Sequence, residues 1–95
     1  MHKIMISAII LMNIERHKIN ETAELLNDMP EISEVFSVSG RYDLIAIVRV
    51  QNIDDLSVLV TNHLLKIGSI EKTDTLLAYK TYSKHDLDAM FSIGE

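Results

Sequence analysis

The sequence predicts a small α+β domain whose elements follow one another as strand, helix, strand, strand, helix, strand. Apolar residues alternate or run almost unbroken in four segments, and recur at three- and four-residue steps in two others. Pro30 ends one helical segment, and Gly40 lies in a short polar turn between two strand-like runs. The chain of 95 residues has room for one hydrophobic core and no second domain.

The spacing of apolar residues changes between the first predicted strand and the first predicted helix. Residues 5–14 are almost continuously apolar and rich in isoleucine, as expected of a central strand packed on both faces. Residues 18–29 have a one-sided apolar pattern, which predicts an amphipathic helix. Pro30 stops this helix because it has no amide hydrogen and disfavours helical geometry in the residue before it.

A hairpin is expected in the middle of the chain, with arms at residues 32–39 and 43–51 around the turn Ser39-Gly40-Arg41-Tyr42-Asp43. Gly40 is free to adopt the positive φ that such turns require. Both faces of the second arm are apolar apart from Arg49, so we expect this strand to be covered on much of both faces.

A second helix and a last strand follow the hairpin. Asn52 is a good N-cap and Gly68 is placed as a C-terminal cap. The apolar stripe between them is Ile53, Leu56, Leu59, Val60, Leu64, Leu65 and Ile67. Residues 70–82 read as the last strand. The chain is therefore divided into a domain at 1–82 and a tail at 83–95, for which a short docking helix and a frayed end remain open alternatives.

This order of elements is the split βαβ, or ferredoxin-like, arrangement, in which a four-stranded antiparallel sheet carries both helices on one face. The first and third strands are central in that topology, and they are the two most apolar strands here. The other face of the sheet has no helix to cover it. Because 47% of the residues are hydrophobic, we expect that face to be buried in a face-to-face dimer, as in dimeric α+β barrels. A well-packed monomer is the alternative interpretation of the same composition.

Composition excludes several classes of function. The net charge is −5, from 14 acidic and 9 scattered basic residues, which argues against direct nucleic-acid binding. The chain has no cysteine, so disulfides and thiolate chemistry are excluded, and a reducing compartment fits. The apolar run at residues 4–12 is far shorter than the ~20 residues that cross a bilayer. We therefore expect a cytoplasmic protein without membrane contact.

The sequence carries no enzyme signature. It has no nucleophile elbow, phosphate loop or dinucleotide fingerprint, and no cofactor or metal is predicted. The four histidines lie at no metal-ligand spacing: His2, His17, His63 and His85. His63 is expected to be a partly buried structural residue at the edge of the second helix's stripe.

The turn at residues 39–43 has two interpretations. It is either a tight hairpin turn, in which Asp43 bonds local amides and Tyr42 packs at the end of the sheet, or a small recognition site. In the second interpretation Asp43 accepts hydrogen bonds from a ligand ammonium, while amides near Gly40 hold a ligand carboxylate. Such contacts suit an α-amino acid.

From Ile9 to about Tyr82, the chain resembles the ligand-sensing C-terminal domain, or RAM domain, of the Lrp/AsnC (feast/famine) transcriptional regulators. The residues that carry the resemblance are Asn13-Ile14, Leu26-Asn27-Asp28-Met29-Pro30-Glu31, Val35 to Ser39, Gly40-Arg41-Tyr42-Asp43-Leu44 and Thr73-Asp74-Thr75. Two departures stand out. Arg41 occupies a position that is often acidic in the family, and no helix-turn-helix domain precedes the first strand, so a stand-alone sensing domain is expected.

The resemblance implies dimers formed through the sheets, commonly assembled into octameric rings, with an amino-acid effector between dimers near the hairpin turn. By position, it carries the effector contacts onto Gly40, Arg41, Tyr42, Asp43, Thr73 and Thr75. The expected function is regulation of transcription, exerted indirectly through oligomerisation or a partner. Two alternatives stay open: a structural module that co-assembles with full-length Lrp/AsnC regulators without binding a ligand, and a small dimeric α+β barrel enzyme using His17 or His63.

Overall fold

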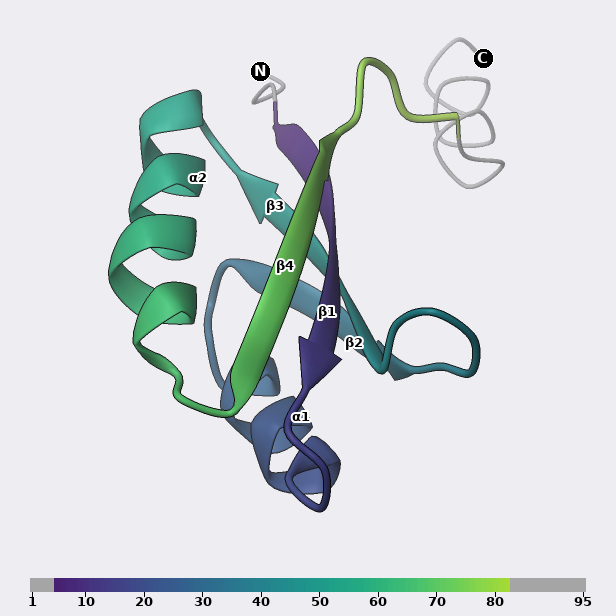
Figure 1. Cartoon of the computed structure of the whole chain (residues 1–95). Helices are drawn as coiled ribbons and strands as arrows, with labels where there is room; N and C mark the ends of the chain where they lie inside the picture. Colours follow the sequence, from purple (N-terminus) through teal and green to yellow (C-terminus); the bar gives the residue numbers. More distant parts are fainter. Residues whose placement is uncertain (1–4, 83–95) are drawn as a thin grey trace, which may run out of the picture.

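The computed structural model describes residues 5–82, so the predicted tail at 83–95 lies outside the described residues. The elements follow the predicted order, and the fold is the predicted ferredoxin-like α+β arrangement (Figure 1). They are β1 (Ile6–Ile14), α1 (Ile19–Asn27), β2 (Ile32–Ser37), β3 (Leu44–Val50), α2 (Ile53–Val58) and β4 (Ile70–Leu77). None of the helices within residues 5–82 is long and apolar enough to cross a membrane.

The four strands form one antiparallel sheet in the order β2-β3-β1-β4, which confirms the prediction that the first and third strands are central. Ile10 of β1 lies opposite Ala46 of β3, and Ile9 lies opposite Ile47. Because residues directly opposite on paired strands point to the same side, this register fixes which side chains share a face. Both helices lie on the face that carries Ile10 and Ala46 (Figure 1).

The hydrophobic core lies between this face of the sheet and the two helices. Its strand residues have no exposed surface at Ala8, Ile10 and Met12 of β1, or at Leu44, Ala46 and Val48 of β3. Leu26 of α1 is equally buried against them. The one buried polar side chain among the described residues, Thr22, donates from Oγ1 to the Lys18 carbonyl at 2.6 Å and lies 2.6 Å from the Ser69 hydroxyl.

The second helix departs from the predicted regular helix ending at Gly68. After Val58 it widens into a π-helical turn, Leu59–His63, and ends in a 3₁₀ turn, Leu64–Lys66. In an ideal α-helix Leu59 and Leu64 would point in different directions, but the wider turn lets both enter the core with no exposed surface. Gly68 has no left-handed φ, so the predicted glycine cap is wrong.

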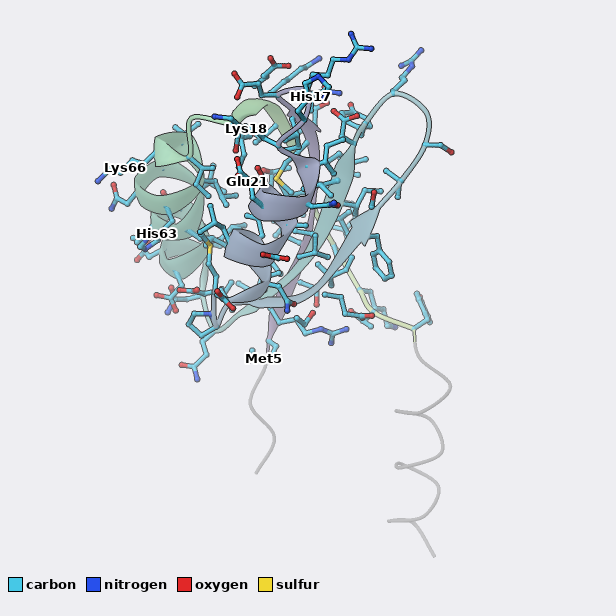
Figure 2. All side chains as sticks on the ribbon, turned by 90° about the horizontal axis from the view of Figure 1, so that it is seen from below. Met5, His17, Lys18, Glu21, His63 and Lys66 are labelled. Atoms are coloured by element: carbon cyan, nitrogen blue, oxygen red, sulfur yellow. The ribbon has the colours of Figure 1, made fainter. Side chains whose placement is uncertain are left out.

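Three side chains of the predicted stripe or its edge are placed differently. Ile53 is 52% exposed and Leu65 is 65% exposed, and His63 is exposed instead of partly buried. Figure 2 shows His63 and Lys66 on the outer side of α2, away from the loop that joins β2 to β3. At the other end of the helix the predicted cap is confirmed, because Asn52 Oδ1 accepts from the Asp55 amide at 2.8 Å.

The ends of two strands also differ from the prediction. β2 stops at Ser37 instead of residue 39. β4 stops at Leu77 instead of residue 82: the Ala78 amide donates to the Ser7 carbonyl at 2.9 Å, and pairing then ends. β1 begins only one residue before Ser7, so the chain beyond Ala78 has almost no strand left to pair with.

The second face of the sheet is open. No described element packs on it, so the single chain does not cover the second face of β3, and the expected coverage there depends on a second subunit. Ile9 and Leu11 of β1 and Ile45 and Ile47 of β3 are partly exposed there. At its margins lie Phe36 of β2, which is 46% exposed, and Leu76 of β4, which is 54% exposed.

Candidate functional site

The turn that joins β2 to β3 projects beyond the sheet as a separate loop (Figure 1). Gly40 lies in this loop with a φ of 111°, a conformation that residues with a side chain rarely adopt. The predicted need for glycine is confirmed. The loop residues Ser39, Gly40 and Arg41 are exposed, whereas Tyr42 and Asp43 are half-buried at the end of the sheet.

Asp43 fastens the loop to β1. Its amide donates to the Met12 carbonyl at 2.9 Å, and its carbonyl accepts from the Val38 amide at 3.0 Å. Its carboxylate oxygen Oδ2 accepts from the amide of Ile14 at 2.8 Å. The side chain thus supplies the acceptor that the β3 backbone would have offered to Ile14 if the strand had continued. The amide is 29 residues away in sequence, so it is not the local partner expected of a turn aspartate.

Two further side chains hold the loop from the sheet. Asn13 Nδ2 donates to the Arg41 carbonyl at 2.7 Å. The Tyr42 hydroxyl donates to a carboxylate oxygen of Asp74 on β4. Asn13 and Asp74 are not among the predicted site residues, although both fall on the polar end of the open face. The alternation of residues along each strand predicts that Asn13 and Asp74 lie on the open face. That they also lie next to the turn follows only from the pairing of the strands.

The hydrogen bond to Asp74 changes the acid–base chemistry of Tyr42. It raises the pKa of the Tyr42 phenol, with partial burial and the negative charge of Asp74 acting in the same direction. Arg41 opposes this shift through its positive charge. A tyrosine with the ordinary pKa of about 10 is already protonated near neutral pH, and the raised pKa keeps the Tyr42 hydroxyl a hydrogen-bond donor to a higher pH.

The predicted site residues separate into two groups. Gly40, Arg41, Tyr42 and Asp43 are together in the loop. Thr73 lies opposite Met12 and Thr75 opposite Ile10, so both threonines belong to the helix-covered face of β4. Asp74 lies opposite Leu11 on the open face. The structure therefore does not bring the threonines to the loop, and the neighbouring residue Asp74 reaches it instead.

The loop retains unused hydrogen-bond donors. Within the described part of the chain, the amides of Ser39, Gly40 and Arg41 donate to no backbone carbonyl. The Arg41 side chain is exposed and forms no ion pair with any described residue. Successive free amides in a turn form a concavity that attracts anions. Among residues 5–82, no group of three histidine, aspartate or glutamate side chains could hold a metal ion.

Comparisons with known proteins identify a family for this chain. Residues 7–87 match the family model described as the Lrp/AsnC ligand binding domain. The chain is 36% identical over 80 residues to the HTH-type transcriptional regulator FL11 of Pyrococcus horikoshii, covering 81% of this chain and 50% of FL11. It thus spans about half the length of the curated relative that it matches.

Solved structures of related proteins have the same fold. TTHA0845 from Thermus thermophilus superposes with a TM-score of 0.78 at 34% identity, over 83% of this chain and 99% of that protein. The transcriptional regulator NMB0573 of Neisseria meningitidis, solved as a complex with L-Met, superposes with a TM-score of 0.75 at 19% identity over 82% of this chain and 52% of that one, which shows the fold alone. With the match over residues 7–87, these comparisons establish that the chain belongs to the Lrp/AsnC ligand binding domain family.

Proposed function

We propose that this domain binds a small effector, an amino acid, in the loop at residues 39–43, at an interface between subunits, and thereby modulates transcription through assembly or a partner. The observation that carries the proposal is the loop itself. It is fastened to the sheet by Asn13, Asp43 and Asp74, while its outer amides stay without acceptors among the described residues.

The loop offers complementary groups to both ends of an amino acid. The free amides of Ser39, Gly40 and Arg41 suit a carboxylate. The second carboxylate oxygen of Asp43 suits an ammonium, since Oδ2 is already taken by the Ile14 amide. Because the loop is held in place before the ligand arrives, little ordering is needed on binding, and this favours affinity. NMB0573, which shares the fold, was solved with L-Met bound.

The open face supports an interface beside this loop. Its centre is apolar, with Ile9, Leu11, Ile45 and Ile47 partly exposed in the single chain. Covering such a patch with a second copy removes apolar surface from water. In a two-fold symmetric dimer the same patch of each subunit contacts its counterpart on the other. The Tyr42–Asp74 hydrogen bond lies at the polar end of the same face, so a ligand at the loop is next to the subunit boundary.

Assembly connects this site to transcription. FL11, an HTH-type transcriptional regulator, is about twice as long as the matched region. A ligand that contacts one arrangement of subunits better than another shifts the population toward that arrangement. The regulated partner would be another polypeptide, such as a full-length regulator, that assembles with this domain.

A thermal-shift screen with the common L-amino acids at millimolar concentration tests ligand binding. A few of them should raise the melting temperature, because a ligand at 100 times its Kd stabilises the folded state by about 2.7 kcal/mol. If no amino acid changes the melting temperature of the wild-type domain, the proposed ligand class is wrong.

Matched leucine substitutions test the interface. Leu11→Lys places a charge on the open face and should lower the molar mass measured by light scattering. Leu25→Lys makes the same chemical change on the exposed side of α1 and should leave the mass unchanged. An equal effect of the two substitutions would contradict an interface formed through the open face.

A further inference from the structure

We propose that the effector is an amino acid with a second carboxylate in its side chain, of the aspartate or glutamate type, and that Arg41 selects it. This inference rests on the proposed function and specifies the ligand class of the same site. Asp43 keeps one oxygen that accepts no hydrogen bond from a described residue, and the outer amides of the loop are free. The Arg41 guanidinium stays unpaired after the ammonium and carboxylate common to all amino acids have been placed.

The hydrogen-bond acceptors at the base of the loop hold it in place. Asp43 Oδ2 is bonded to the Ile14 amide at 2.8 Å, and one carboxylate oxygen of Asp74 is bonded to the Tyr42 hydroxyl. The Arg41 carbonyl accepts from Asn13 Nδ2 at 2.7 Å. Each of these acceptors therefore holds part of the loop in place, and the second oxygen of Asp43 stays available for a ligand ammonium.

The outer part of the loop carries free hydrogen-bond donors. The amides of Ser39, Gly40 and Arg41 have no described backbone acceptor, and the Arg41 guanidinium has no carboxylate partner among residues 5–82. Lys72 lies on the same face of β4 as Asp74, two residues away. The outer part of the loop, residues 39–41, therefore offers free amide donors and the positive charge of Arg41.

The charged groups of an amino acid match these positions. In any α-amino acid the carboxylate is suited to the free amides and the ammonium to the remaining oxygen of Asp43. These two contacts leave the guanidinium of Arg41 unpaired. Its planar fork fits a carboxylate through two parallel hydrogen bonds, whereas a ligand ammonium would be repelled by it. An uncharged side chain would gain little, because the exposed guanidinium stays hydrated.

Isothermal titration of the wild-type domain with isosteric ligands measures this selectivity. L-glutamate should bind about tenfold more tightly than L-glutamine, the difference that a charge-assisted hydrogen bond contributes. L-aspartate and L-asparagine should show the same order, and L-lysine should bind most weakly. Glutarate, which has both carboxylates and no ammonium, should bind more weakly than L-glutamate.

Substitutions at Arg41 assign the selectivity to one side chain. Arg41→Gln should weaken L-glutamate binding about tenfold while changing L-glutamine binding little, which removes the preference. Arg41→Glu should move the preference toward L-lysine. Lys66→Gln is the control, because it removes an exposed cation from the end of α2, on the side of the molecule away from the loop (Figure 2), and should leave the glutamate-to-glutamine ratio unchanged.

The outcomes separate this inference from the proposed function. Binding of neutral amino acids with equal or higher affinity than glutamate, or a preference for glutamate that survives Arg41→Gln, would overturn the inference and leave the proposed function standing. Glutarate binding as tightly as L-glutamate would overturn the amino-acid part of the inference. Failure of every amino acid to bind would overturn both.

Discussion

The same strands form both faces of the sheet, yet the two faces lie in different environments. On β1, Ala8, Ile10 and Met12 have no exposed surface, whereas the alternate residues Ile9 and Leu11 remain partly exposed. Both sets are apolar. The difference arises because both helices lie on one face and no described element lies on the other.

This difference shows where folding is completed and where assembly is expected. The helix-covered face forms the hydrophobic core within the single chain. Thr73 and Thr75 of β4, predicted as ligand contacts, lie on this face. The loop at residues 39–43 is tied instead to the open face, through the hydrogen bond from Tyr42 to Asp74.

The largest effect is expected from truncation on the helix-covered face. Ile10→Ala should lower the free energy of unfolding by about 2–5 kcal/mol, because it removes buried methylene groups and leaves a cavity. Ile9→Ala, one residue away on the open face, should cost about 1 kcal/mol in dilute protein. Urea denaturation at low protein concentration measures both values. Equal losses would mean that the open face is covered in the isolated chain as well.

The next largest effect is expected at the end of the sheet, where the loop meets β1. Asp43→Ala leaves the Ile14 amide without its acceptor and should cost about 1–3 kcal/mol of unfolding free energy. Asp43→Asn retains an oxygen acceptor and should cost less. Hydrogen exchange at the Ile14 amide provides a local readout. An amide equally protected in wild type and Asp43→Ala would show that the carboxylate does not hold the loop.

A smaller effect is expected from the glycines. Gly40→Ala should lower the free energy of unfolding by about 1–2 kcal/mol, because an alanine is strained at this left-handed φ. A steric clash does not contribute, since nothing lies within 4 Å of an added Cβ. Gly68→Ala meets equally open space without a left-handed φ and should be close to neutral. Thermal unfolding of the two variants under the same conditions makes the comparison. Similar losses at both sites would contradict a special role for the backbone of Gly40.

The smallest effect concerns the titration of Tyr42 on the open face. Its pKa is raised, so the stabilisation from its hydroxyl is fully present below the ordinary tyrosine pKa of about 10 and is lost as the pH rises through the higher folded value. The difference between the alkaline absorbance titrations of wild type and Tyr42→Phe isolates this group. Its midpoint should lie above that of the urea-unfolded protein. Asp74→Asn should move the midpoint downward, and no movement would exclude Asp74 as the cause.

Much of the fold could be predicted because local patterns specify it. Alternating apolar residues, the helix stop at Pro30, the Asn52 cap and the turn at Gly40 each depend on a few neighbouring residues. The order of the elements then restricted the topology to one with β1 and β3 in the centre. The π-helical turn at Leu59–His63 could not be predicted from neighbouring residues. It lets Leu59 and Leu64 both pack into a core whose other side is formed by strands distant in the sequence.

The candidate site shows the same division. The sequence by itself determined the loop and its special glycine, since the requirement for a positive φ is local. It also determined that Arg41, Tyr42 and Asp43 occupy that loop. Only the tertiary structure decided what these residues do. Strand pairing brings Ile14 to the Asp43 carboxylate, Asn13 to the Arg41 carbonyl and Asp74 to Tyr42, across 28 to 32 residues of sequence. The same pairing turns Thr73 and Thr75 toward the helices, because neighbouring residues of a strand point to opposite faces.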